Sequence, residues 1–166
     1  MEIVPASMEY VDSFWAAIDE VAHERKYLRF TEAPQIESTR LFVKSILDNG
    51  WVQYYALEDD RVVGWCDILS NDFETTKHSG KVGMGVIAKC RRQGLGRRLL
   101  MVAIEKAFEN GLTRIELDVH ATNTAACSLY ASLGFREEGR KRKAIYLDGA
   151  YKDIIVMALF ADEWKG

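Results

Sequence analysis

The sequence predicts a mixed α/β fold in which about four helices flank a mostly antiparallel sheet of about seven strands. The periodicity of apolar residues gives the order strand, helix, helix, three strands, helix, strand, helix, two strands. Short turns join several neighbouring strands, so those pairs should be antiparallel. Two central strands are joined through a helix instead, which requires a parallel pair with a right-handed crossover.

The first part of the chain should supply one strand and two helices. "EIVPA" is expected to be a strand, and "ERKYLRFTEAP" is expected to be a loop. Between them, residues 8–23 carry apolar side chains at steps of three and four, which is typical of an amphipathic helix. A second helix is expected over residues 36–47, ended by "DNG", with an inward face formed by Leu41, Phe42, Ile46 and Leu47.

The remaining elements alternate strands and helices. "WVQYYALEDDRVVGWCDIL" is expected to be a hairpin around Asp59 and Asp60, followed by the strand "KVGMGVI". "GLGRRLLMVAIEKAFENG" and "NTAACSLYASLGF" are expected to be helices on either side of the strand "TRIELDVH". "REEGRKRKAIYL" and "AYKDIIVMALF" should form a last hairpin around the favoured turn "DG".

Composition limits the class of protein. With 166 residues and no evident linker, residues 1–166 are expected to form a single domain. The net charge of -3 gives no basic field for nucleic acid, and no apolar run reaches the length of a membrane span. The three cysteines show no disulfide or metal-ligand spacing, so no metal site is expected. We expect a cytoplasmic protein, as a monomer or homodimer, with neither nucleic acid nor membrane as partner.

The stretch "RRQGLGRRLL" places two glycines inside four arginines at the start of a helix. The first N–H groups of a helix lack partners within it, and glycine lets an anion approach them closely. Arginine adds donors suited to phosphate oxygens. The stretch therefore indicates a phosphate or diphosphate site at Gly94 and Gly96. The alternative is a helix that begins at a glycine turn and carries solvated arginines.

Two other phosphate motifs fit the sequence poorly. A P-loop needs a Lys-Ser/Thr ending, which is absent after Gly96. A dinucleotide-binding GxGxxG has its third glycine at the position where this chain has Leu99, although Glu116 and Asp118 lie near the required acidic spacing. The motif also follows an antiparallel hairpin, so the Rossmann interpretation is weak.

Two further glycines, Gly83 and Gly85, interrupt the preceding strand. Glycine inside a strand often marks a bulge or a ligand close to the backbone. A bulge would part this strand from the one after the crossover helix and open a cleft above the glycine-arginine turn. A ligand with a diphosphate and a long amide-bearing arm, such as coenzyme A, would fit such a cleft. Relief of crowding is an equally good explanation of both glycines.

These segments resemble a known family. "VIAKCRRQGLGRRLL" resembles the acyl-coenzyme A signature [QR]xxGx[GA] of the GNAT N-acetyltransferase superfamily, with Arg91, Gly94 and Gly96 in its three places. "HATNTAACSLYASLGF" resembles the second signature of that family, with Asn123 opening the helix and Tyr130 near its end. The resemblance covers roughly residues 82–159, and both signatures together are strongly specific.

The resemblance implies a fold and a set of ligand contacts. The fold would be of the GNAT type, with the parallel pair splayed at its centre and acetyl-coenzyme A bound as acetyl donor. The backbone near Gly85 would contact the pantetheine arm, the segment from Arg92 to Arg97 would wrap the pyrophosphate, and Asn123 would hold the arm from the other strand. The expected cofactor-binding residues are Met84, Gly85, Val86, Arg91, Arg92, Gln93, Gly94, Leu95, Gly96, Arg97, Asn123 and Tyr130.

The same resemblance implies a reaction, the N-acetylation of an amine. An alkyl ammonium with a pKa near 10.4 must lose a proton before it can attack, and a carboxylate in the cleft can accept it. Asp118 is the best candidate, Glu116 and His120 are weaker ones, and water alone is an alternative. Tyr130 would protonate the departing sulfur, and the N–H of Val86 could donate to the thioester carbonyl.

The acceptor is less well defined by the sequence. Tyr27, Phe30 and Glu32 in the loop after the first helix could line an amine pocket, where aromatic rings favour a cation and Glu32 offsets its charge. A capping loop whose aromatics join the core explains these residues equally well. Small amines, amino acids, polyamines and protein N-termini all fit. The alternative function is a non-catalytic, regulatory module that binds coenzyme A.

Overall fold

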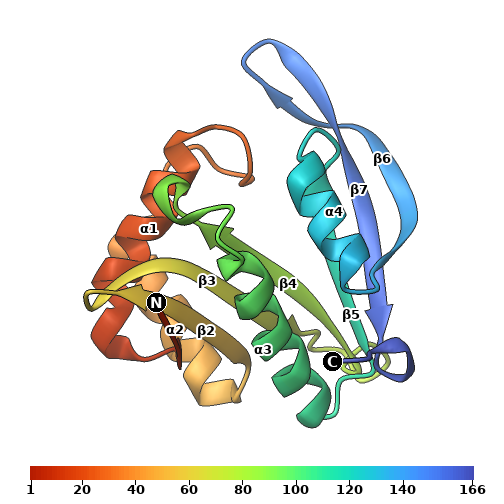
Figure 1. Cartoon of the computed structure of the whole chain (residues 1–166), viewed down its shortest axis with the longest axis horizontal. Helices are drawn as coiled ribbons and strands as arrows, with labels where there is room; N and C mark the ends of the chain where they lie inside the picture. Colours follow the sequence, from red (N-terminus) through yellow and green to blue (C-terminus); the bar gives the residue numbers. More distant parts are fainter.

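A computed structural model describes residues 1–166 and contains one seven-stranded sheet with the strand order β1-β2-β3-β4-β5-β7-β6 (Figure 1). Only β4 and β5 are parallel, and every other neighbouring pair is antiparallel. The predicted fold class is confirmed. The strands are β1 Glu2–Pro5, β2 Val52–Glu58, β3 Arg61–Ser70, β4 Ser79–Val86, β5 Arg114–His120, β6 Arg136–Leu147 and β7 Ala150–Phe160.

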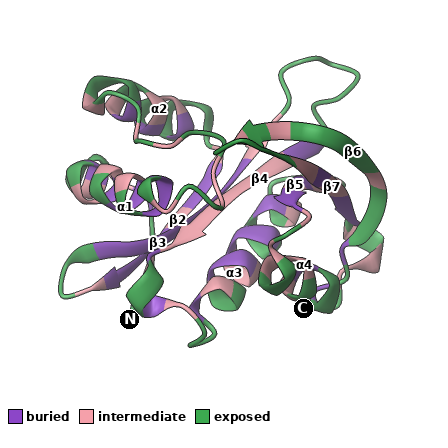
Figure 2. Cartoon of the chain, turned by 90° about the horizontal axis from the view of Figure 1, so that it is seen from above, coloured by how far each residue is buried: buried purple, intermediate pink, exposed green.

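Four α-helices lie on the two faces of this sheet. Helices α1 and α2 cover one face, and α3 and α4 cover the other (Figure 2). The crossover from β4 to β5 runs through α3, as the sequence predicts. The helices are α1 Val11–His23, α2 Ile36–Asn49, α3 Leu95–Glu109 and α4 Thr124–Ser132, with short 3-10 turns at η1 Met8–Tyr10, η2 Ala88–Cys90 and η3 Ala161–Glu163.

The two predicted hairpin turns have the backbone conformation that tight hairpins need. Asp59 and Asp60 join β2 to β3 with φ of 49° and 59°. Asp148 and Gly149 join β6 to β7 with φ of 51° and 75°. Positive φ at both central positions matches the right-handed twist of the strands. The second hairpin extends beyond the body of the molecule (Figure 1).

The inward face of α2 differs from the prediction. Its buried residues are Thr39, Val43 and Ile46, which recur at steps of four and three. Leu41 is 68% exposed and Leu47 is 45% exposed. The predicted inward face was therefore wrong at both leucines, because the packing against α1 selects a neighbouring stripe of the helix.

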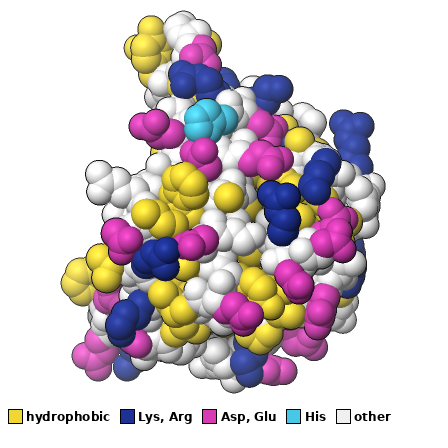
Figure 3. All heavy atoms as spheres, turned by 90° about the vertical axis from the view of Figure 1, so that its left-hand side faces the viewer, with side chains coloured by type: hydrophobic (Ala, Val, Ile, Leu, Met, Phe, Trp, Pro, Cys, Tyr) yellow, Lys and Arg dark blue, Asp and Glu magenta, His cyan; other side chains and the backbone are white.

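The outer surface over α1 and α2 carries interspersed acidic and basic side chains with small apolar patches between them (Figure 3). Neither charge dominates this face of the molecule. None of the helices is both long enough and apolar enough to cross a membrane.

The central parallel pair parts without a bulge. β4 and β5 are paired from Ser79 opposite Arg114 to Lys81 opposite Glu116, and then they separate. On its other side, β4 keeps an unbroken register with β3 from Gly80 to Val86. The parting of the strands was predicted correctly, but the bulge proposed as its cause was wrong.

The glycines of β4 make room for side chains from β3. A Cβ at position 83 would lie 2.6 Å from Oδ1 of Asp67, and one at position 85 would collide with the ring of Trp65. Asp67 and Trp65 are the residues opposite these two glycines in the β3–β4 register. Both glycines thus allow a side chain of β3 to lie flat across β4, which is the alternative that the sequence left open.

Candidate active site

The segment between β4 and α3 leaves the start of α3 open. Gly94 is the N-cap of α3, with φ of 77°, and no side chain caps this end. Arg92 also has a left-handed backbone, with φ of 59°. The backbone hydrogen bonds of α3 begin with the N–H of Arg98, which donates to Gly94 O at 3.1 Å. The N–H groups of Leu95, Gly96 and Arg97 are therefore available to an anion.

A cavity of about 370 Å³ lies beside this turn, between β4 and α4. It is lined by all of the residues predicted to bind the cofactor except Gln93. The Gln93 amide instead donates to Lys89 O at 3.1 Å, on the exposed side of the turn. The structure thus brings the two signature segments to one cavity and leaves the Gln93 side chain outside it.

The four arginines of the motif do not all surround the turn. Arg91 donates to both carboxylate oxygens of Glu24 and to Val86 O, and its guanidinium stacks 4.7 Å from the centre of the Tyr27 ring. Arg98 lies at 3.4 Å from Met1 O, and Arg97 donates to Ser132 Oγ at 3.0 Å beside the cavity. The expectation that all four arginines surround the glycines was wrong at Arg98, which does not line the cavity, and Arg91 lines it with its guanidinium paired to the loop after α1.

The free edge of β4 presents the backbone of alternate residues. Ile87 N–H donates to Val63 O on β3, and backbone groups alternate in direction along a strand. The N–H and C=O groups of Met84 and Val86 therefore point toward the parted edge, while those of Gly85 point toward β3. The carbonyl of Val86 accepts from Arg91. The N–H of Val86 points to the same open edge and is the group available to a ligand. Gly85 contributes its lack of a side chain rather than its backbone.

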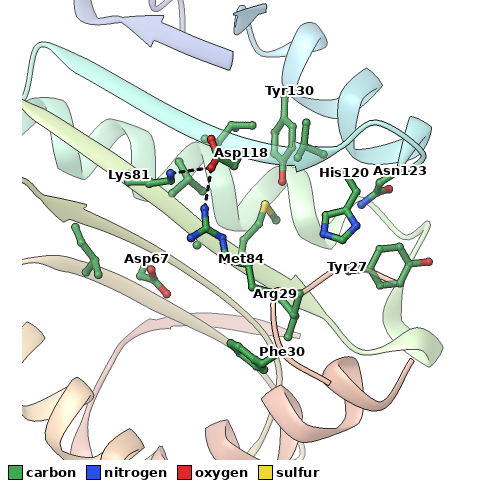
Figure 4. A pocket seen from close by; sticks show the side chains of 16 residues that line it. Tyr27, Arg29, Phe30, Asp67, Lys81, Met84, Asp118, His120, Asn123 and Tyr130 are labelled. Atoms are coloured by element: carbon green, nitrogen blue, oxygen red, sulfur yellow. Dashed lines mark hydrogen bonds and ion pairs between the residues drawn. The ribbon is translucent and has the colours of Figure 1, made fainter. Parts of the chain in front are cut away.

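Helix α4 presents Asn123 and Tyr130 to the same cavity. Asn123 caps the helix by accepting from the Ala126 N–H at 3.2 Å, so its amide nitrogen is the part left to meet a ligand. Tyr130 is 7% exposed, and its hydroxyl makes no hydrogen bond within the chain. The hydroxyl points into a second cavity, which adjoins the first (Figure 4). Burial raises the pKa of this hydroxyl above its ordinary value, so it stays protonated at neutral pH.

A second cavity of about 380 Å³ adjoins the first (Figure 4). The loop after α1 lies along it and contributes Tyr27 and Phe30 to the lining, as predicted. Glu32 is exposed and is absent from the lining, so its predicted position in the pocket was wrong. The two cavities share four lining residues, which are Tyr27, Met84, Asn123 and Tyr130.

Asp118 lies in this second cavity and is surrounded by cations. Its Oδ2 accepts from Arg29 at 2.8 Å and Lys81 at 3.0 Å (Figure 4), and from Lys141 at 3.1 Å. Burial alone would raise the pKa of Asp118, but the hydrogen bonds and charges of Lys81 and Lys141 outweigh it and hold the pKa below its ordinary value. The position matches the prediction, whereas the electrostatics are those of an ion-pair centre and weaken Asp118 as a proton acceptor.

The sequence analysis missed a second carboxylate in this cavity, that of Asp67. It is 6% exposed and lines the cavity from β3. Burial raises its pKa to about 7, although the neighbouring Gln53 amide opposes part of the shift. The available signal was an acidic residue within the otherwise apolar run "VVGWCDIL".

Two other titratable side chains are His120, which lines the second cavity, and Cys127 on α4, which lines neither. Burial, with a smaller contribution from Lys152, lowers the pKa of His120, whose Nδ1 is buried without a partner. Burial raises the pKa of the Cys127 thiol, which makes the nucleophilic thiolate scarcer. Neither residue has the surroundings of an activated nucleophile.

Parted parallel strands, an open helix start and two joined cavities are the arrangement of a transferase that brings a phosphate-bearing donor to an acceptor. The model of the acetyltransferase (GNAT) family matches residues 15–135, and the chain belongs to this family. The [ribosomal protein bS18]-alanine N-acetyltransferase of Escherichia coli strain K12 is 42% identical over 69 residues. That match covers 42% of this chain and 47% of the relative, so the chain spans about half the length of this curated relative.

Solved structures share the whole fold. A ribosomal-protein-alanine N-acetyltransferase from Brucella melitensis has a TM-score of 0.90 and 22% identity, covering 96% of this chain and 99% of that chain. The acetyltransferase yncA from Salmonella typhimurium, solved with its cofactor acetyl-CoA, has a TM-score of 0.92 and 18% identity, covering 100% and 96%. At these identities the likeness establishes the fold alone.

Proposed function

We propose that this protein transfers an acetyl group from acetyl-coenzyme A directly to a primary amine, with both substrates bound together. The observation that carries the proposal is the junction of the two cavities at Met84, Asn123 and Tyr130. One cavity ends at an open helix start suited to a diphosphate, and the other contains unpaired polar groups suited to an amine. A reacting carbonyl at the junction would be accessible from both sides.

The residues of the first cavity fit acetyl-coenzyme A. The free N–H groups at the start of α3, with Arg92 and Arg97 beside them, would hold the diphosphate. Gly96 keeps the approach open, since a Cβ there would point toward Met84 and Leu129 at 3.5 Å and 3.7 Å. The exposed backbone edge of β4 would pair with the amides of the pantetheine arm as an added strand would.

Acetyl-coenzyme A supplies an activated acyl group as a thioester, and groups on β4 and α4 would assist its transfer. The Val86 N–H, on the open edge of β4, would donate to the carbonyl oxygen as negative charge develops there. The hydroxyl of Tyr130 would donate a proton to the departing sulfur. Asp118 would hold Arg29 and its loop over the acceptor cavity through the ion pair at 2.8 Å.

The acceptor we propose is a peptide N-terminus or a small primary amine. The aromatic rings of Tyr27 and Phe30 border the cavity and would favour a cationic group. Two relatives are named as alanine N-acetyltransferases of ribosomal proteins, which makes alanyl peptides the first acceptors to test. We place this reaction in the cytoplasm, where the three unpaired cysteines would remain reduced.

Release of free thiol from acetyl-coenzyme A, measured over alanyl peptides, amino acids and polyamines, tests the proposal. We expect amine-dependent thiol release with at least one acceptor and a mass increase of that acceptor by one acetyl group. Binding of coenzyme A without thiol release for any amine would instead identify a regulatory module. No binding of coenzyme A would contradict both interpretations.

A further inference from the structure

We propose that Asp67 binds the ammonium group of the acceptor and accepts its proton, an inference that rests on the proposed acetyl transfer. Asp67 forms part of the wall of the acceptor cavity that also contains Met84 and Tyr130 (Figure 4). Among the carboxylates that line this cavity, Asp118 is neutralised by three cations, whereas Asp67 makes no ion pair within the chain.

The sheet places Asp67 between β2 and β4. Gln53 on β2 and Gly83 on β4 are its direct neighbours in the antiparallel register. A Cβ at position 83 would lie 2.6 Å from Oδ1, so a larger residue there would force the carboxylate out of its present position. The carboxylate therefore lies across β4 at Gly83, on the strand whose Val86 N–H is expected to hold the donor carbonyl three residues further on.

The surroundings of Asp67 suit an ammonium group. Asp67 is more than nine-tenths buried, and an unpaired buried carboxylate is unfavourable unless a cation joins it. The wall beside it includes the exposed ring of Phe30, which favours a cation as well. The other titratable or charged side chains that face this cavity are Tyr27, Arg29, Lys81, Asp118, His120 and Tyr130.

A carboxylate with a pKa of about 7 is suited to proton transfer at neutral pH, because a substantial fraction is ionised there and the ionised form is a stronger base than an ordinary carboxylate. One N–H bond of the ammonium breaks and an O–H bond forms on Asp67. The freed lone pair forms a C–N bond to the thioester carbon as the C–S bond breaks. Tyr130 gives its proton to the sulfur and regains one from the nitrogen, and Asp67 releases its proton to solvent, which completes the balance.

Kinetics of Asp67→Asn with two amines test this role at pH 7 and saturating acetyl-coenzyme A. With the best alkylamine or alanyl peptide of the panel, we expect kcat to fall about 10²-fold. With trifluoroethylamine, which is uncharged at neutral pH and needs no base, we expect a loss at least tenfold smaller. Asp60→Asn, an exposed aspartate in the β2–β3 turn, is the matched control and should change neither rate.

Binding and stability separate this role from a structural one. The variant should keep the thermal shift that coenzyme A gives the wild type, and its own Tm at pH 8 should rise. Equal losses with both amines, or no loss, would overturn the role of Asp67 while leaving acetyl transfer intact. A wild type that acetylates no amine would overturn the proposed function and this inference together.

Discussion

The guanidinium of Arg91 makes a two-point ion pair with the carboxylate of Glu24 and stacks on the ring of Tyr27. Arg91 belongs to the turn before α3, whereas Glu24 and Tyr27 belong to the loop after α1 that lines the acceptor cavity. The contact therefore joins the two halves of the site, and the residue that resembles a phosphate ligand in sequence acts as a connection between loops.

Replacing Glu24 with Gln should loosen this connection. We expect a stability loss of about 1 kcal/mol, because a hydrogen-bonded ion pair that is only partly exposed is weakened. The KM values for the amine and for acetyl-coenzyme A should both rise several-fold, since one contact supports both sites. Steady-state kinetics measure this, with Glu37→Gln in the exposed pair with Arg40 as control. A lower Tm with both KM values unchanged would show a purely structural contact.

Replacing Gly96 with Ala should separate stability from cofactor affinity. Within a helix, alanine is favoured over glycine by about 1 kcal/mol, and the new Cβ meets no atom of the chain closer than 3.5 Å. We therefore expect an equal or higher Tm and a Kd for coenzyme A raised at least tenfold. Calorimetric titration measures the affinity, with Gly139→Ala in β6 as control. Unchanged affinity would remove Gly96 from the diphosphate site.

Replacing Tyr130 with Phe should leave the buried ring in place and remove only its hydroxyl. The ring packs against Phe135 with centroids 5.9 Å apart, so the fold should be retained. We expect kcat to fall on the order of 10²-fold, as for loss of a general acid, with unchanged affinity for coenzyme A. Tyr151→Phe on the exposed hairpin is the control. Full turnover in Tyr130→Phe would refute the assignment of the acid.

Local motifs predicted the parts of the site that depend on local backbone geometry. Gly94 at the N-cap of α3 and Asn123 at the N-cap of α4 were identified from short stretches, because a helix start is determined by its own few residues. The turns at Asp59 and Asp148 were predictable for the same reason.

Residues whose role depends on distant partners were predicted less well. The burial of Asp67 follows from its pairing with Gln53 and Gly83 on two other strands, and no local pattern records that register. Arg91 has its place in the family signature, but its partner Glu24 lies 67 positions away. Glu32 was expected in the pocket from composition alone, and the path of the loop leaves it exposed.

Replacing Asp118 with Asn should distinguish a base from an ion-pair centre. Without the carboxylate, Arg29, Lys81 and Lys141 lose the oxygen that they share, so the loop and the hairpin strand β6 should lose a common anchor. We expect a raised KM for the amine and a kcat loss smaller than in Asp67→Asn. A kcat loss of about 10²-fold that is absent with trifluoroethylamine would instead establish Asp118 as the base.

The stability of Asp67→Asn should depend on pH in a definite direction. Burial raises the pKa of Asp67 from 3.8 to about 7, so its favourable contribution is complete below about pH 4 and is lost as the pH rises through 7. Asparagine is neutral at every pH, so the Tm difference in favour of the variant should grow from pH 4 to 7 and then level off. The raised pKa sets a ceiling of roughly 4 kcal/mol on this difference, and we expect at least about 1 kcal/mol. Thermal unfolding of Asp67→Asn across this pH range, with Asp60→Asn as the control, measures the Tm difference.

A variant less stable than the wild type at pH 8 would mean that the carboxylate supports the fold. A variant that is more stable and slower than the wild type is what a carboxylate retained for catalysis requires.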